Sequence, residues 1–363
     1  MAKSEAPEAR QEGITIDCDV HQDWATEEEF VAYLPEHFQD RGITPPGDLG
    51  WVNPIAAQGL GRQDAVPADG SPPGSSQELM EDQLFDDFGV DYAVLTGSLL
   101  QVRLAGHPNT HYAKACVEAY NDWLIEEWLE EDDRYLGSLI IAPQVPAHAV
   151  EEIERVGSHD QIVQVMIPGA DQSPYGHERY WPIFEQAERM GLPMATHTTT
   201  GGYGIAWSAM TSAGHPISYP ERHMGTITSN LGNLVSTVFE GVFEEYPDLD
   251  WIFMESGFGW LPHYLWKMDK LWKGIRESTP WLKKRPSEYI RENVWFTTQQ
   301  IEEPEKPEHL PQLLDMIHAD ETLVFSSDYP HWDNDNPKSI FRGIDDDMRR
   351  HIFSENARQI YGL

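Results

Sequence analysis

Acidic residues and histidines stand at the ends of several apolar runs in this sequence. Five of them follow or close such a run: Asp19, His21, His197, Glu255 and Asp328. Burying charged groups is costly unless something compensates them. A neutral imidazole together with carboxylate oxygens is a ligand mixture that suits a divalent metal ion. If the apolar runs are strands whose ends converge, the sequence predicts a metal site at that point.

The first of these runs carries Asp17, Asp19 and His21 at alternating positions. Side chains alternate between the two faces of a strand, so Asp19 and His21 point to the same side. We expect these two to share one ion. Asp17 lies one step deeper on the same side, so we expect it to support the site rather than bind the ion. Taken singly, such residues also have ordinary explanations, such as a local salt bridge for Glu255 or a helix cap for Asp328.

Eight short apolar runs have the length and composition of strands, and amphipathic segments separate them. The runs cover residues 14–20, 91–97, 135–143, 162–169, 193–198, 251–257, 293–299 and 322–328. Several intervening segments repeat apolar residues at a spacing near 3.6, which is typical of helices. Eight β units with helical crossovers predict an α/β protein, a (β/α)8 TIM barrel whose strand ends converge on one mouth. A doubly wound sheet is the alternative.

The barrel prediction implies a domain organisation. We expect a polar tail at residues 1–13, followed by a single barrel domain at 14–363. Two long stretches interrupt the alternation, an insertion at 23–77 and a Gly- and Ser-rich lid at 199–222. Both follow predicted strands, so both should lie on the face where barrel enzymes place their active sites. Loops of this length in a compact domain are usually functional lids or disordered.

Composition narrows the choice of partners. The formal net charge of −36 argues against nucleic acid and against an anionic membrane surface, because both are negative. The acidity fits either adaptation to high salt or an ordinary acidic cytosolic protein, and both stay open. The two cysteines, Cys18 and Cys116, are too few and too far apart for a disulfide framework. With no apolar signal segment and no membrane-length apolar run, we expect a cytoplasmic protein acting on a small molecule.

Motifs in five places resemble the amidohydrolase-related family, in the branch typified by aminocarboxymuconate-semialdehyde decarboxylase and γ-resorcylate decarboxylase. They are IDCDVH at the start, MATHT in the middle, MESGFGWLPHYLWKMD, FSSDYPHWD, and the ending FSENARQIYGL. Together they run over nearly the whole chain from residue 14, and their order and spacing are more specific than any one of them. The resemblance implies a metal-dependent TIM barrel.

The resemblance also implies roles for individual residues. The family's first-strand metal-binding pair falls on Asp19 and His21, its strand-5 histidine on His197, and its strand-8 aspartate on Asp328. The strand-6 histidine that assists proton transfer in the decarboxylases is replaced here by Glu255. A glutamate found three residues later in γ-resorcylate decarboxylase-like enzymes is replaced by Phe258. These departures mark a subgroup with the sequence ESG and weaken a direct transfer of the decarboxylase mechanism.

Three functions from different classes follow from these residues. The first is a metal-dependent hydrolase of a small organic substrate, in which one Zn²⁺ or Mn²⁺ activates water and Asp328 and Glu255 move protons. The second is a non-oxidative decarboxylase of an aromatic or unsaturated carboxylic acid. The third is a barrel that binds metal without turnover. The carboxylate at position 19 favours harder ions, so Mn²⁺ competes with Zn²⁺.

Further residues are candidates for contacting the substrate. They are His331 after the eighth strand, His223 at the start of the helix after the lid, Trp207 in the lid, and Arg103 and Arg222, the two arginines placed to clamp a carboxylate. The stretch WLPHYLWKMDKLW at 260–272 is an aromatic amphipathic helix, suited to barrel packing or to the interface of a homodimer.

Overall fold

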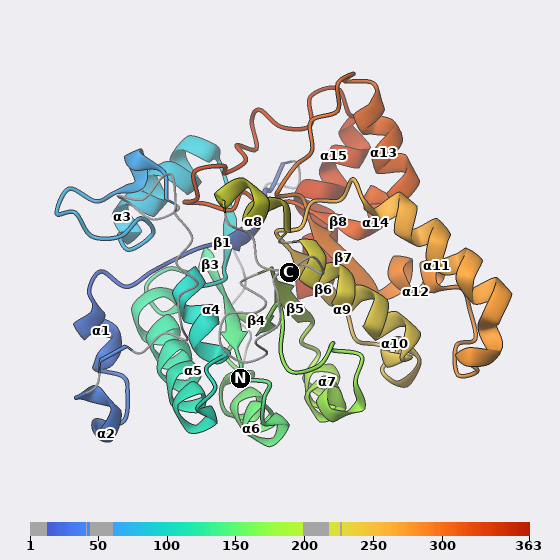
Figure 1. Cartoon of the computed structure of the whole chain (residues 1–363). Helices are drawn as coiled ribbons and strands as arrows, with labels where there is room; N and C mark the ends of the chain where they lie inside the picture. Colours follow the sequence, from blue (N-terminus) through green and yellow to red (C-terminus); the bar gives the residue numbers. More distant parts are fainter. Residues whose placement is uncertain (1–12, 41, 44–60, 199–217, 226) are drawn as a thin grey trace, which may run out of the picture.

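The computed structural model describes residues 13–40, 42–43, 61–198, 218–225 and 227–363. Within them, eight parallel strands pair in sequence order from β1 to β8 (Figure 1). The strands are Ile16–Val20, Tyr92–Leu95, Tyr135–Ile140, Ile162–Pro168, Met194–His197, Trp251–Met254, Val294–Thr297 and Leu323–Val324. The predicted (β/α)8 barrel is confirmed, and the doubly wound alternative is wrong.

The first and last strands come together to complete the barrel. Backbone hydrogen bonds run from Cys18 N to Phe325 O at 2.9 Å and from His21 N to Tyr329 O at 2.7 Å. A third runs from Asp328 N to Asp19 O at 3.1 Å. These bonds join β1 and His21 to the segment that follows β8, so the carboxyl ends of the first and last strands are held side by side.

All eight strands are shorter than predicted, and after two of them, β6 and β8, the backbone takes an unusual conformation. β6 ends at Met254 and β8 at Val324, whereas the apolar runs continue to residues 257 and 328. Glu255, directly after β6, has φ of 51°, and Asp328, four residues after the end of β8, has φ of 62°. Backbone of this left-handed kind is uncommon for residues other than glycine and often marks functional positions.

Helices connect the strands and surround them (Figure 1). They are α1 Glu27–Val31, α2 Glu36–Gln39, α3 Gln77–Met80, α4 Leu99–Ala105, α5 Thr110–Leu124, α6 Pro146–Val156, α7 Trp181–Met190, α8 Tyr219–Gly225, α9 Ile227–Phe239, α10 Val242–Glu245, α11 Leu261–Ile275, α12 Pro286–Asn293, α13 His309–Ile317, α14 Ala319–Thr322, α15 Asp346–Arg350 and α16 Asn356–Tyr361. Short π-helical stretches continue α3 over Glu81–Phe88 and α5 over Ile125–Leu129, and link α15 to α16 over His351–Glu355.

Local sequence explains why the crossover helices begin and end where they do. The Asn109 side chain accepts a hydrogen bond from Tyr112 N at the start of α5, a common helix cap. Pro182 stands in the first turn of α7, and Gly191 ends that helix with φ of 68°. The apolar faces of the helices pack on strands that are buried almost throughout, with Trp123 and Trp251 among the largest enclosed side chains.

The expected insertion and lid lie partly outside the described residues. Within the insertion at 23–77, α1 and α2 and the segment 61–77 are placed. Of the predicted lid at 199–222, residues 199–217 lie outside the described residues, and the last four residues belong to α8, which begins at Tyr219. Among the described residues, no helix combines the length and the apolar character that crossing a membrane requires.

Candidate metal centre

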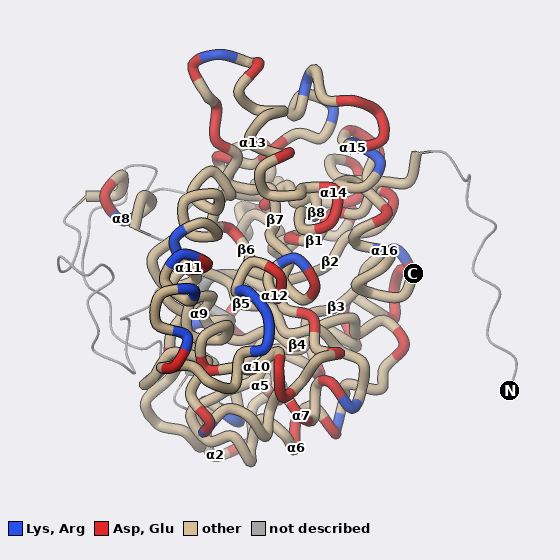
Figure 2. Tube along the Cα trace, turned by 90° about the vertical axis from the view of Figure 1, so that its right-hand side faces the viewer, with Lys and Arg blue, Asp and Glu red and all other residues tan. Residues whose placement is uncertain are grey.

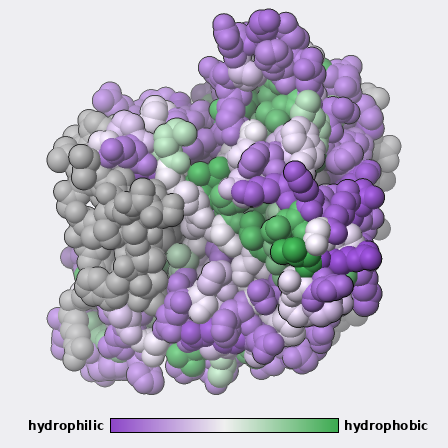
Figure 3. Space-filling view, turned by 45° about the vertical axis from the view of Figure 1, so that its right-hand side comes forward, coloured by the Kyte–Doolittle hydropathy of each residue, from purple (hydrophilic) through white to green (hydrophobic). Residues whose placement is uncertain are grey.

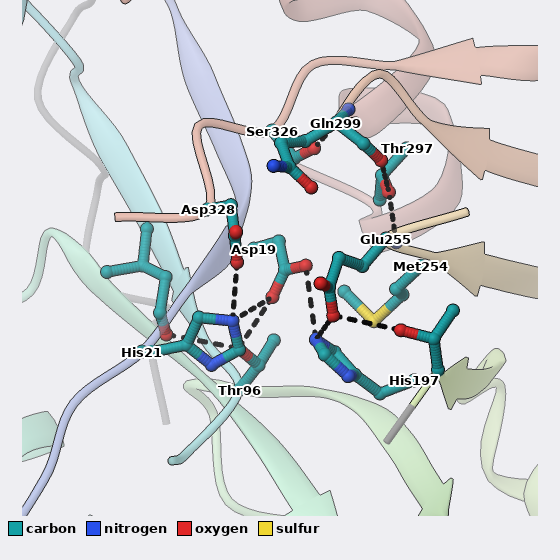
Figure 4. Close-up of polar contacts among 12 residues, drawn as sticks. Asp19, His21, Thr96, His197, Met254, Glu255, Thr297, Gln299, Ser326 and Asp328 are labelled. Atoms are coloured by element: carbon teal, nitrogen blue, oxygen red, sulfur yellow. Dashed lines mark hydrogen bonds and ion pairs between the residues drawn. The ribbon is translucent and has the colours of Figure 1, made fainter. Parts of the chain in front are cut away.

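Three of the predicted ligands meet at the mouth of the barrel. Asp19, His21 and His197 each offer a ligand atom, and these atoms lie within 4.8 Å of one another. Asp19 lies between the two rings, with Oδ1 3.6 Å from His21 Nε2 and Oδ2 3.4 Å from His197 Nε2 (Figure 4). All three side chains are buried. The structure therefore places residues from β1 and β5, almost 180 positions apart, around one point.

Asp328 joins this cluster from the turn after β8. Its Oδ1 accepts a hydrogen bond from His21 Nε2 at 2.8 Å (Figure 4) and lies 2.8 Å from His331 Nδ1. Ligand atoms of His21, Asp328 and His331 also lie within 4.8 Å of one another. The sequence suggested His331 only as a substrate contact, but the structure places it directly against a predicted ligand.

The unpaired polar atoms of this cluster fit a cation. Asp19 Oδ2, Asp328 Oδ2 and His197 Nε2 are buried and have no hydrogen-bond partner among the described residues. Such groups normally have one, because leaving them unpaired costs free energy. His21 differs, since its Nδ1 lies 2.5 Å from the carbonyl oxygen of Gly97. Donation from Nδ1 fixes the ring and leaves Nε2 to face the cluster, an arrangement common for metal-binding histidines.

The protonation of the cluster follows from its mixture of charges. Burial alone would lower the pKa of His21, but the neighbouring Asp19 and Asp328 outweigh it and raise that pKa to about 10. The same balance raises the pKa of His197, through Asp19 and Glu255. The nearby imidazoles of His331 and His21 overcome burial at Asp328 and hold the pKa of its carboxyl well below the usual range. Without a metal, His21 therefore carries a proton that a metal ion must displace.

Asp17 lies behind the ligands, as the alternation on β1 predicts. Its Oδ1 accepts hydrogen bonds from Ser327 N at 2.9 Å and Asp19 N at 3.2 Å. Burial raises the pKa of this carboxyl to about 7. These hydrogen bonds come from the backbone of the segments that carry Asp19 and Asp328, so Asp17 positions both predicted ligands.

Glu255 stands at the open side of the cluster. Its Oε2 accepts a hydrogen bond from Thr198 Oγ1 at 2.9 Å and lies 3.6 Å from His197 Nε2 (Figure 4). Its backbone N–H donates to Thr297 Oγ1 at 2.9 Å, which holds the unusual backbone conformation in place. The side chain is partly exposed, unlike those of Asp19 and Asp328. Glu255 can therefore exchange protons with both the cluster and the mouth.

His223 reaches the same side of the mouth from α8. It does not begin the long helix α9, as the sequence suggested, but lies within the separate helix α8. Its Nε2 lies 2.8 Å from Asp333 Oδ2 and 2.8 Å from the side-chain amide of Gln300, which in turn lies 3.4 Å from Glu255. The hydrogen bond with the Asp333 carboxylate raises the pKa of His223 above its ordinary value.

The other residues predicted to contact the substrate are Arg222, Arg103 and Trp207. Arg222 is buried on α8, with its guanidinium 6.0 Å from the centre of the Tyr219 ring. Arg103 lies on α4, half-buried, in the crossover that follows β2. Trp207 lies outside the described residues.

Three further residues of the site were not predicted from the sequence. Thr96 Oγ1 donates to Asp19 Oδ1 at 2.7 Å from the end of β2, where its position after an apolar run was a usable signal. Gln300 and Asp333 contact His223 from segments 77 and 110 positions away. No local pattern marks contacts of that kind.

A parallel eight-stranded barrel with carboxylates and histidines gathered at its mouth is an amidohydrolase-type architecture. The chain belongs to the amidohydrolase family, whose model, described as Amidohydrolase, matches residues 16–363. It is thus an enzyme of the amidohydrolase superfamily, as the resemblance implied.

Individual relatives agree with this assignment. The chain is 26% identical over 351 residues to γ-resorcylate decarboxylase of Rhizobium sp. (strain MTP-10005), covering 93% of this chain and 98% of the relative. Amidohydrolase map2389c from Mycobacterium avium subsp. paratuberculosis K-10 has a similar structure, with a TM-score of 0.75 at 20% identity over 98% of this chain and 99% of that chain. So does 5-carboxyvanillate decarboxylase from Novosphingobium aromaticivorans DSM 12444, complexed with manganese and 4-hydroxy-3-methoxy-5-nitrobenzoic acid, with a TM-score of 0.70 at 18% identity over 97% of each chain. The two structural likenesses establish the shared fold.

Proposed function

We propose that this protein is a metal-dependent, non-oxidative decarboxylase of an aromatic carboxylic acid. The observation that carries the proposal is the buried cluster of two carboxylates and two imidazoles with unpaired ligand atoms. The relative from Rhizobium, a decarboxylase that aligns over nearly the whole chain, supports this reaction over the hydrolysis that the sequence first suggested.

Asp19, His21, His197 and Asp328 would hold the ion, either Mn²⁺ or Zn²⁺. Their mixture of nitrogen and oxygen ligands suits both. When bound, such an ion supplies positive charge that holds and polarises the oxygens of a substrate. Asp17, Thr96 and the Gly97 carbonyl then keep the ligand side chains oriented through the hydrogen bonds described above.

The chain's own residues supply the proton that decarboxylation requires. The bond between the ring carbon and the carboxylate breaks, its electron pair stays on the ring carbon, and CO₂ leaves. That carbon then takes a proton, which we assign to the carboxyl group of Glu255 because it is partly exposed and faces both the cluster and the mouth. A proton transfer positioned in this way typically contributes about 10²–10⁴ in rate.

Other residues of the mouth would bind and orient the substrate. His331 is held by Asp328, and His223 is held by Asp333, so both rings keep fixed orientations at the edge of the cluster. We assign substrate contacts to these two histidines, to the guanidinium groups of Arg222 and Arg103, and to Trp207.

Hydrolysis is the second candidate, and Glu255 is the observation that favours it. A glutamate in place of the decarboxylases' strand-6 histidine is an acceptor suited to a proton from an attacking water. In that reaction Asp328 would share the proton, and the substrate would be a small ester, lactone or amide.

One assay separates these candidates. The protein, loaded separately with Mn²⁺ and Zn²⁺, is incubated with 2,6-dihydroxybenzoate and with 5-carboxyvanillate, and CO₂ and the phenolic product are measured. Release of CO₂ that is lost in a His21→Ala variant supports the proposal. Cleavage of esters, lactones or amides without any CO₂ from the aromatic acids would replace it with hydrolysis. Bound metal with neither reaction would favour a barrel without turnover.

A further inference from the structure

The turn between β6 and α11, residues 255–260, carries Glu255 and contains two glycines. Its backbone is unusual, because Glu255 has φ of 51° and Gly257 has φ of 60°. Left-handed backbone at a residue other than glycine persists only where its surroundings hold it. The turn supplies one contact of its own, since the indole N–H of Trp260 donates to Ser256 O at 2.9 Å. Other contacts come from the segment that follows β7.

Two residues of that neighbouring strand and its loop contact Glu255 itself. Thr297, at the end of β7, accepts a hydrogen bond from the Glu255 backbone N–H at 2.9 Å. The side-chain amide of Gln300 lies 3.4 Å from Glu255 Oε1. These contacts act on Glu255 directly, whereas the end of the turn is held by a third side chain.

That third side chain is Glu302, a half-buried residue two positions after Gln300. Its carboxylate accepts hydrogen bonds from the backbone N–H groups of Phe258 at 3.2 Å and Gly259 at 2.9 Å. Burial raises the pKa of this carboxyl, and the hydrogen bonds from the two N–H groups oppose the rise. Hydrogen bonds that a carboxylate accepts are stronger than those between neutral groups. Glu302 therefore closes the turn just before α11 begins.

The two glycines of the turn leave room for the Glu302 carboxylate. A methyl group added at Gly257 would lie 2.6 Å from Glu302 Oε1 and 2.9 Å from the carbonyl oxygen of Gln300. A methyl group added at Gly259 would lie 3.1 Å from Glu302 Oε1. Larger side chains would thus push the carboxylate away from the N–H groups that it binds. Both glycines of the motif ESGFG fit the close approach of Glu302.

Glu302 differs in this respect from most acidic residues of the chain. Asp and Glu lie mainly on the helices and loops around the barrel (Figure 2), and the face of the molecule shown in Figure 3 is mostly hydrophilic. Glu303, Glu305 and Glu308, in the same loop, are exposed. Exposed carboxylates of this kind contribute little to stability. Glu302 instead lies against the backbone of another segment, so it can fix the position of that segment.

We propose that Glu302 is a positioning residue that holds the Glu255 carboxyl in place for proton transfer. The inference rests on the proposed function, which assigns the proton to that carboxyl, and it applies equally to hydrolysis, in which Glu255 also moves a proton. Glu302 acts through the backbone of the turn. A displacement of about 1 Å can cost roughly 100-fold in rate, so loss of Glu302 should slow turnover while metal binding stays intact.

The experiment compares Glu302→Ala with the wild type, both loaded with Mn²⁺, on the substrate that the wild type turns over. The value of kcat should fall about 10–100-fold. KM and the affinity for Mn²⁺ should stay within about twofold of the wild-type values, because Glu302 contacts neither the substrate nor a predicted ligand in the proposal. Glu305→Ala is the matched control, since Glu305 is an exposed glutamate of the same loop, and it should behave as the wild type. An unchanged kcat in Glu302→Ala would overturn the proposal.

Glu302→Gln adds a conservative variant. It keeps the size of the side chain and one acceptor oxygen, so its kcat should lie between those of the wild type and Glu302→Ala. It also replaces Glu302→Ala in every measurement if the alanine variant does not fold. A conservative variant slower than Glu302→Ala would count against the hydrogen bonds as the cause.

Two double-mutant cycles separate positioning from a general loss of structure. Adding Glu302→Ala to Glu255→Gln should not slow the enzyme further, because the carboxyl to be positioned is already gone. Gly259→Ala should slow the wild type by displacing the Glu302 carboxylate, but it should not slow Glu302→Ala. Losses of rate that multiply in either cycle would overturn the proposal.

Crystal structures of the wild type and Glu302→Ala test the positioning apart from the reaction. In the variant, Glu255 Oε2 should leave Thr198 Oγ1, from which it accepts a hydrogen bond at 2.9 Å, while Asp19 and His197 keep their places. A wild type that turns over no substrate would refute the proposed function, and these structures then decide the positioning by themselves. A Glu255 side chain that stays in place in Glu302→Ala would overturn the proposal.

Discussion

The two ends of the barrel contain the same kinds of residues in different settings. At the mouth, Asp19, His21 and Asp328 are buried almost completely, and their charged partners are one another and His197. At the other end, ahead of β7 and β8, a cleft of about 740 Å³ is also lined by acidic residues and a histidine, His351. There, however, Arg291 pairs with Glu321, and these side chains are 49% and 42% exposed.

This difference indicates why the mouth, rather than the cleft, suits a metal ion. In the cleft, water solvates the carboxylates, and an arginine pairs with one of them. Such an exposed pair contributes only about 0–1 kcal/mol to the stability of the protein. At the mouth, the carboxylates are shielded from water, no arginine pairs with them among the contacts described, and several atoms of the predicted ligands have no hydrogen-bond partner among the described residues. Burial without a permanent cation, rather than the presence of acids and histidines, distinguishes the mouth.

The largest expected effect comes from His21→Ala. His21 contacts both Asp19 and Asp328, so its loss removes one of the four predicted ligands and the side chain that contacts two of the others. Altering a residue that merely supports a metal ligand costs roughly 10–100-fold in metal affinity, and losing a ligand should cost more. Titration of metal-free protein with Mn²⁺, followed by calorimetry, measures this. An affinity for Mn²⁺ within threefold of the wild-type value would contradict the metal site proposed at the mouth.

The Glu255→Gln variant should lose turnover while it keeps its bound metal. The amide keeps the size of the side chain but cannot donate the assigned proton, so the turnover rate should fall by about 10²–10⁴. Bound metal should stay near the wild-type level, because Glu255 is not among the predicted ligands. Metal content by mass spectrometry and initial rates are measured on the same samples. Loss of metal together with activity would instead make Glu255 a ligand.

Metal affinity should rise with pH. Because the pKa of His21 is raised to about 10 without metal, the ring is protonated at neutral pH and must release that proton when it binds. Affinity should therefore increase by up to about tenfold per pH unit from pH 6 to pH 9. Calorimetry in two buffers of different ionisation enthalpy counts the protons released. An affinity that does not change with pH would contradict the protonated cluster.

Asp17→Asn should stabilise the protein at alkaline pH. The carboxyl has a pKa of about 7 when folded and 3.8 as its ordinary value, so the folded protein holds a proton that the unfolded chain has lost. The wild type therefore loses stability as pH rises from about 4 to 7, and the variant avoids a loss on the order of 2–4 kcal/mol.

Thermal melts of the metal-free proteins at pH 5 and pH 8 measure this effect of Asp17. The gain should be larger at pH 8, and the variant should bind more metal than His21→Ala does. Equal loss of metal in the two variants would show that Asp17 is itself a ligand.

The smallest effect is expected in the opposite cleft. Glu321→Gln removes the carboxylate that pairs with Arg291, and because the pair is exposed, stability should change by less than about 1 kcal/mol. Neither metal affinity nor activity should change. This variant is the matched control for the mouth, since it also removes an acidic side chain near a histidine.

The sequence predicted most of the barrel and the core of its mouth for a simple reason. Buried parallel strands are apolar, so polar residues such as Asp19 and His197 stand out at their ends, and the topology brings those ends together. The features that the sequence did not predict depend on backbone conformation and on contacts between distant segments. The backbone is left-handed at Glu255, where β6 ends, and at Asp328 in the turn after β8, and no apolar pattern encodes it. The contact of His223 with Asp333 joins segments 110 positions apart.

The most direct test of this account is a crystal structure of the protein grown with Mn²⁺, with anomalous diffraction recorded at the manganese absorption edge. We predict one strong peak per chain, bonded to Asp19, His21, His197 and Asp328. A peak in the cleft beside Arg291 and Glu321, or no peak at the mouth in protein that binds manganese in solution, would contradict it.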